Sequence, residues 1–187
     1  MSGTEHGHTH GHAEGPGFAA RLAVTLLLVP LLLIALKPVL MQFVQSRAAA
    51  YAGSGRFDDA IRVSKKWLVF NGQNPEAWSD IATLYRSAGR REEALRAYEK
   101  ALAFDPDNAK THFEMGMFYT GSKEWAAAAP HFERARQLSL DGAKLTNAAR
   151  YRSALIMLER CYTGLADTEK AAAARAELAA RFPSATR

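Results

Sequence analysis

Hydrophobic and polar positions divide the chain into three zones. Residues 1–17 are polar, glycine-rich and without periodicity, and we interpret them as a disordered tail. From Leu22 to Leu36 the sequence is apolar and contains no charged residue. From residue 41 onward, apolar side chains return every three or four positions, which indicates amphipathic helices over 41–187. The pattern therefore predicts an all-α chain with a tail, an apolar segment and one helical domain.

The apolar segment has the length of a membrane span. Phe18 to Leu36 covers 19 positions, which as a helix extend over roughly 28 Å, close to one hydrocarbon thickness. Arg21 and Lys37 stand near its two ends, where their charges can reach the lipid headgroups. We therefore predict a single transmembrane helix over 18–40 that contacts the lipid bilayer.

A cleaved signal peptide is the alternative interpretation of this segment. Its N-terminal region would be poor in positive charge. The small residues 48–50 that could form a cleavage site lie well past the apolar run, beyond Lys37 and Arg47. Pro30 is tolerable in a membrane helix, where it would produce a kink. The uncleaved anchor is therefore the better interpretation.

A 34-residue period runs through the helical zone. Counted from Pro75 as position 1, bulky residues stand at positions 4, 7, 11 and 24, and small residues at positions 8, 20 and 27. In this best-matching unit they are Trp78, Ile81, Tyr85 and Tyr98, and Ala82, Ala94 and Ala101. The predicted units cover 41–74, 75–108, 109–142 and 152–185. The last fits only after the insertion 143–151 and is degenerate, because Glu159 and Arg175 occupy a small-residue and an aromatic position.

This spacing resembles the tetratricopeptide repeat (TPR), a helix–turn–helix unit of 34 residues. The resemblance implies an α-solenoid of three to four antiparallel helix pairs over 41–187. Small residues would allow the two helices of a pair to approach, and the aromatic residues would be core rather than a cofactor site. Asn74 before Pro75 suits a helix start, and Gly89 suits the turn between two helices. Pro130 falls inside the second helix of its unit, where it would cost little only near the first turn.

The same resemblance indicates a candidate partner-binding surface. In the family, positions 2, 5, 9 and 12 of the first helix of each unit usually face a bound peptide. The residues that we select from these positions are Arg86, Lys110, Phe113, Met117, Ile156 and Arg160. They lack the asparagine and the spacing of the family's carboxylate clamp. They suggest instead an apolar patch with a basic margin, suited to an amphipathic helix or an extended segment of a protein partner.

Catalysis and cofactor binding find no support in the sequence. The helical zone holds two histidines and one cysteine, and its glycines occur singly, without a phosphate-binding loop. His112 stands at a core position and Cys161 precedes the core residue Tyr162, so we interpret both as packed side chains. A single cysteine excludes an intramolecular disulfide. We therefore predict no enzyme activity and no cofactor.

Charge gives little reason to expect a nucleic-acid partner. The chain has 24 Lys and Arg residues against 19 Asp and Glu residues, a net charge of +5. The basic residues are interspersed with acidic ones rather than gathered in a block, as on an ordinary solvated surface.

The tail offers one chemical alternative. His6, His8, His10 and His12 alternate with other residues, so an extended backbone would place the four imidazoles on one side. Imidazole suits zinc, copper and nickel, but the flexible glycines leave such a site unformed before a metal binds. Metal binding through this tail, as a sensor or metallochaperone, therefore remains an alternative function.

The sequence as a whole predicts a bacterial single-pass inner-membrane protein that docks a protein partner as a scaffold or assembly factor. That partner would be a membrane complex or its client. A stoichiometric accessory subunit of a larger membrane complex is the second alternative. Lys37, Arg47 and Arg56 after the span, against Arg21 before it, favour a cytoplasmic domain. Resemblance to bacterial signal-anchored TPR proteins favours the periplasm, where we expect the repeats.

Overall fold

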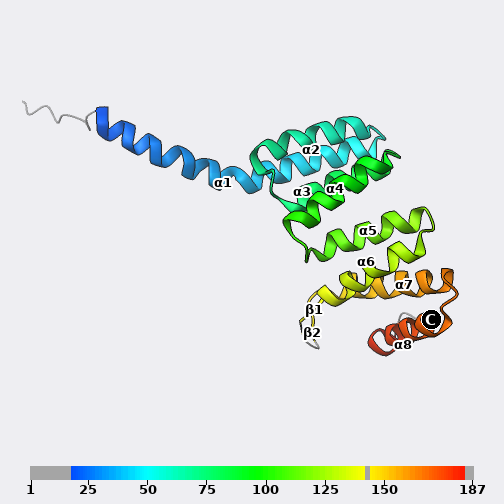
Figure 1. Cartoon of the computed structure of the whole chain (residues 1–187). Helices are drawn as coiled ribbons and strands as arrows, with labels where there is room; N and C mark the ends of the chain where they lie inside the picture. The colour runs from blue at the N-terminus through cyan, green and yellow to red at the C-terminus, as the bar shows by residue number, and fades with distance from the viewer. Residues whose placement is uncertain (1–17, 142–143, 184–187) are drawn as a thin grey trace, which may run out of the picture. The chain divides into compact units, whose positions relative to one another are not determined.

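The computed structural model of the chain describes residues 18–141 and 144–183. The described part is all-α apart from one short ribbon, as the sequence predicts. Its elements are α1 (Phe18–Gly53), α2 (Phe57–Asn71), α3 (Pro75–Ser87), α4 (Arg91–Phe104), α5 (Ala109–Gly121), α6 (Trp125–Leu138), β1 (Leu140–Asp141), β2 (Lys144–Leu145), α7 (Ala148–Gly164) and α8 (Thr168–Arg181) (Figure 1).

The chain divides into two units, 1–43 and 44–187. The described part of the first unit is the N-terminal portion of α1, where apolar side chains such as Leu27 and Ile34 are exposed. From Thr25 to Gly53, α1 is long and apolar enough to cross a membrane. The helix continues through Pro30 and Pro38.

The second unit is built from helix pairs in chain order. The most extensive contacts join α3 to α4, α5 to α6 and α7 to α8, and α6 also packs on α7 (Figure 1). First helices of successive pairs also touch, α3 against α5 and α5 against α7. This arrangement is a helical-repeat solenoid, in which each pair contacts mainly its neighbours.

Asparagine caps begin the first helices of three pairs. The Ala77 amide donates to Asn74 Oδ1 at 3.1 Å, and the Thr111 amide donates to Asn108 Oδ1 at 3.0 Å. Asn147 caps α7 in the same way, with the Arg150 amide at 2.9 Å. Each cap accepts a bond from an amide that has no partner within its helix. The predicted start of α3 at Asn74 and Pro75 is therefore confirmed.

Small residues lie where the helices of a pair approach, as the sequence predicts. Ala82, Ala94 and Ala101 are fully buried. In the next pair, a Cβ added to Gly116 would lie 2.8 Å from the Phe132 ring, so the aromatic ring occupies the space that glycine leaves. Ile81, Tyr85 and Tyr98 are core residues as predicted, whereas Trp78 is only partly buried and its Nε1 donates to the Gly72 carbonyl at 2.7 Å.

The insertion between the α5–α6 and α7–α8 pairs adds a feature that the sequence pattern does not predict. Leu140 pairs with Leu145 and Asp141 with Lys144 in an antiparallel ribbon, β1–β2. The ribbon precedes α7, which begins at Ala148 and is the longest of the helices that start after α1 in the described residues. Leu140 and Leu145 pack against a cluster formed by Tyr151, Leu155 and Leu178. The ribbon therefore covers one end of the α7–α8 pair.

Candidate partner-binding groove

The first helices of three pairs, with the turns that follow them, line an open cavity of about 610 Å³. Its walls are Arg86 of α3, Met117, Thr120 and Gly121 of α5, Lys123 and Trp125 after α5, and Arg160, Thr163 and Gly164 of α7. A second cavity, of about 260 Å³, shares Arg86, Met117 and Gly121 with the first and adds Gly89, Arg91, Phe118 and Ser122. We call these two adjoining cavities the basic groove.

Three of the six predicted binding residues line the larger cavity. Arg86, Met117 and Arg160 come from three different helices and meet there because α3, α5 and α7 lie in register. Met117 also packs against the core beneath, so only part of its side chain is available to a ligand.

The other three predicted residues lie elsewhere. Lys110 Nζ forms an ion pair with Asp80 Oδ1 at 2.6 Å, which ties α5 to α3. Phe113 packs edge-on against Phe132, with ring centroids 5.5 Å apart, and belongs to the core around it. Ile156 of α7 is exposed outside the groove. The groove is consequently less apolar than the sequence suggests.

Trp125 is a groove residue that the sequence analysis does not identify. It begins α6, and a Cβ added to Gly164 would lie 2.6 Å from its ring, so the indole packs closely on the end of α7. The Arg160 guanidinium carbon lies 5.8 Å from the centre of the same ring, within cation–π range. Trp125 thus forms a flat apolar wall beside a cation.

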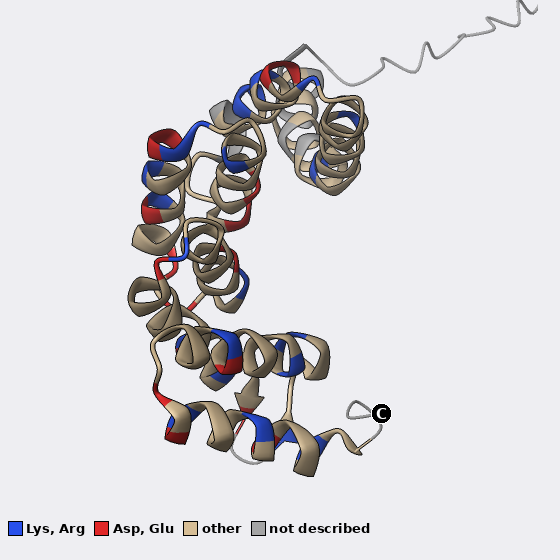
Figure 2. Cartoon of the chain, turned by 90° about the vertical axis from the view of Figure 1, so that its right-hand side faces the viewer, with Lys and Arg blue, Asp and Glu red and all other residues tan. Residues whose placement is uncertain are grey.

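Positive charge exceeds negative charge in the groove. Arg86 pairs with Glu114 at 3.1 Å, and Arg91 pairs with Glu124. Lys123 and Arg160 have no carboxylate within ion-pair distance among the described residues. Two uncompensated cations therefore line the same cavity as Trp125. Elsewhere on the second unit, basic and acidic residues are interspersed along the helices (Figure 2).

Comparison with known proteins identifies one kind of repeat in the chain. A family model described as TPR repeat matches residues 82–120, which run from α3 through α5. The chain contains a tetratricopeptide repeat. No curated protein matches this TPR chain.

Solved structures share its fold. MamA residues 41 to the end from Desulfovibrio magneticus RS-1 is 17% identical, with a TM-score of 0.61 over 76% of this chain and 75% of that chain. BtubC from P. vanneervenii is 20% identical, with a TM-score of 0.64 over 81% and 67%. PcrH in complex with the chaperone binding region of PopD is 18% identical, with a TM-score of 0.57 over 67% and 93%.

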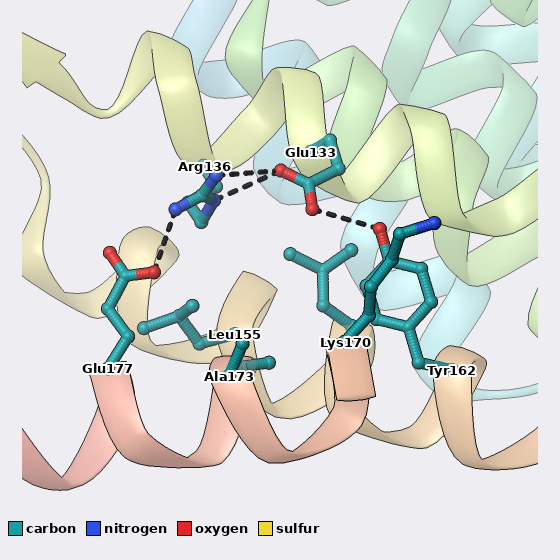
Figure 3. A pocket seen from close by; sticks show the side chains of 9 residues that line it. Glu133, Arg136, Leu155, Tyr162, Lys170, Ala173 and Glu177 are labelled. Carbon is teal, nitrogen blue, oxygen red and sulfur yellow. Dashed lines mark hydrogen bonds and ion pairs between the residues drawn. The ribbon is translucent and has the colours of Figure 1, made fainter. Parts of the chain in front are cut away.

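A smaller cavity of about 120 Å³ lies between the last three helices of the TPR unit (Figure 3). The polar side chains that line this cavity contact one another. Arg136 pairs with Glu133 at 2.9 Å and with Glu177 at 2.8 Å, and Tyr162 Oη donates to Glu133 at 3.0 Å. Burial and this bond raise the pKa of Tyr162 to about 12. The network joins α6, α7 and α8, so its role is to fix their packing.

The cysteine is packed, as the sequence predicts. Cys161 is fully buried against Phe132 and Leu158. Burial raises the pKa of its thiol to about 11, so the reactive thiolate is scarce at neutral pH. His6, His8, His10 and His12 lie outside the described residues. Among the described residues, no three His, Cys, Asp or Glu side chains converge as a metal-ion site.

Proposed function

We propose that this TPR protein is a membrane-anchored interaction module that docks a partner protein in the basic groove. The observation that carries the proposal is the meeting of Arg86, Lys123 and Arg160 around Trp125 and Met117 in one open cavity. The cavity lies where the first helices of successive repeats come together, the surface expected to bind peptides. PcrH, which shares the fold, is seen with a region of PopD bound.

The groove chemistry favours a partner segment that combines carboxylates with one bulky apolar side chain. Lys123 and Arg160 offer charge-assisted hydrogen bonds to carboxylates. Trp125 and the exposed part of Met117 offer an apolar surface between those charges. A segment with acidic residues on both sides of a Leu or Phe fits this arrangement.

Membrane attachment rests on α1. Its stretch from Thr25 to Gly53 has the length and apolar character of a span, and Lys37 is the one charged residue in Leu22–Leu40. We place the span in a bacterial inner membrane with the repeats in the periplasm, the topology of a signal anchor. A phosphatase fused after Arg187 would be active in that topology. An inactive fusion would place the repeats in the cytoplasm, as Arg47 and Arg56 favour.

Purification of the full chain in a gentle detergent tests the docking proposal. The native chain and two variants, Arg160→Glu and Arg152→Glu, are crosslinked in cells, purified and compared by quantitative mass spectrometry. Arg152 is an exposed residue on the same helix, outside the groove, and serves as the matched control. We expect at least a tenfold loss of partners with Arg160→Glu and none with Arg152→Glu.

Equal recovery of partners in all three chains contradicts groove docking. A fixed set of membrane partners at equal copy number, retained with Arg160→Glu, identifies the chain instead as an accessory subunit held through its span.

A further inference from the structure

Two histidines of the α5–α6 pair face each other outside the basic groove. His112 lies on α5 and His131 on α6, and their Nδ1 atoms are 3.1 Å apart. Both side chains are partly buried. Neither contributes to the walls of the groove or to the network around Arg136.

The outer contacts hold both rings in place. His112 Nε2 donates to the Pro106 carbonyl oxygen at 2.9 Å. Because a carbonyl oxygen only accepts, Nε2 carries the proton, and Nδ1 of the neutral ring presents a lone pair toward His131. The His131 ring is stacked on Tyr119, with centroids 5.7 Å apart and planes 12° from parallel.

The surroundings of His112 match those of a metal-binding histidine. Such a residue usually donates its second ring N–H to a carbonyl or carboxylate, which fixes the tautomer and the ring orientation. Pro106 supplies that acceptor for His112. An ion at about 2.0–2.1 Å from both Nδ1 atoms, 3.1 Å apart, would subtend an angle of roughly 100°, between octahedral and tetrahedral values.

We propose that His112 and His131 bind a divalent transition-metal ion of the zinc class through their two Nδ1 atoms. Without metal, His131 Nδ1–H donates to His112 Nδ1. On binding, the His131 proton moves from Nδ1 to Nε2 through exchange with water, so that both Nδ1 lone pairs reach the ion and no net proton is released. Two protein ligands leave the other positions to water, and the expected dissociation constant is therefore in the micromolar range or weaker.

The experiment uses the full chain with His6, His8, His10 and His12 all replaced by Ser. Since the chain has six histidines, this background retains only the proposed pair. Zn²⁺ is titrated into ¹⁵N-labelled protein, and the imidazole nitrogen resonances are followed by NMR. We expect both Nδ1 resonances to move together and to saturate, and the thermal unfolding midpoint to rise.

Two variants in that background localise the effect. His112→Trp installs the residue that Trp78 provides at the same position of the preceding repeat, so the fold should tolerate it. His131→Gln removes the second ligand. Each should weaken Zn²⁺ binding at least tenfold. Unchanged imidazole resonances up to millimolar Zn²⁺, or Zn²⁺ binding in both variants as tight as in the parent background, would overturn the proposal and leave the pair as a hydrogen bond between two histidines.

Discussion

At the scale of single residues, the turns between paired helices share one backbone conformation. Gly55 and Gly89 have φ angles of 75° and 73°, and the equivalent residues of the later pairs, Lys123 and Ala166, have φ angles of 59° and 58°. Glycine adopts this left-handed region readily, whereas a residue with a Cβ is strained there. The turn geometry is therefore maintained in repeats that have lost the glycine.

The turn geometry predicts opposite effects of two substitutions. Ala166→Gly should stabilise the fold by about 0.5–1 kcal/mol, because it removes the left-handed strain. Gly89→Ala should destabilise the fold by a similar amount. A Cβ there meets no atom within 4 Å, so the left-handed backbone conformation is the only source of strain. Urea unfolding of the two variants measures both effects. Destabilisation by Ala166→Gly would contradict this explanation.

His131 gives the stability a pH dependence. Burial and the neighbouring His112 lower its pKa below the ordinary value near 6.5. At a pH between the lowered pKa and the ordinary one, the unfolded chain binds more protons than the folded chain. The free energy of unfolding therefore falls as the pH drops below about 6.5, and this group does not affect it above that pH. His131→Gln should make the free energy of unfolding depend less on pH between pH 7 and 5. An equal slope in the variant would show that other groups cause the loss.

At the scale of elements, Arg136 adds a polar contact between α6 and α8 to the packing of α8 on α7. Its guanidinium contacts Glu133 on its own helix and Glu177 on α8, and about 29% of both Arg136 and Glu177 is exposed (Figure 3). Tyr151 Oη also donates to Glu177. Arg134, two residues earlier, pairs with the largely exposed Asp107 instead. The two arginines therefore differ in burial but not in chemistry.

Arg136→Met should destabilise the fold by about 1–2 kcal/mol, since it removes the cation that two partly buried carboxylates share. The matched control Arg134→Met should cost less than about 0.5 kcal/mol, because its ion pair is exposed to solvent. Native-state hydrogen exchange checks the location of the effect: protection should fall in α8 and remain in α3 and α4. A uniform loss of protection would contradict a role confined to the last helices.

At the scale of the whole molecule, the 34-residue period carries most of the fold. The alternation of bulky and small residues, with Asn74 and Gly89 as boundary signals, is enough to predict paired helices because each feature has a direct steric reason. Strands of two residues have no period, so the ribbon at Leu140–Leu145 leaves no signal in the pattern. The architecture therefore follows from the sequence, while this local addition does not.

The groove was only partly predictable. Arg86, Met117 and Arg160, selected from family positions, line the larger cavity, and their contact with a partner stays a prediction. Phe113 occupies an equivalent position but reaches Phe132 and packs with it. Trp125 stands at a turn, outside the first helices, and its place in the groove depends on how Gly164 admits the indole. Contacts between individual side chains of neighbouring helices determine the places of Phe113 and Trp125, and a repeat pattern does not specify such contacts.

The most direct test of partner docking is site-specific photocrosslinking in living cells with the full chain. A photoreactive amino acid replaces Thr163, an exposed residue that lines the groove, or Arg152, an exposed residue on the same helix outside it. We expect a discrete crosslinked protein from Thr163, absent from Arg152 and lost when Arg160→Glu is added. The same crosslinked protein from both positions, or none from Thr163, would contradict binding in the groove.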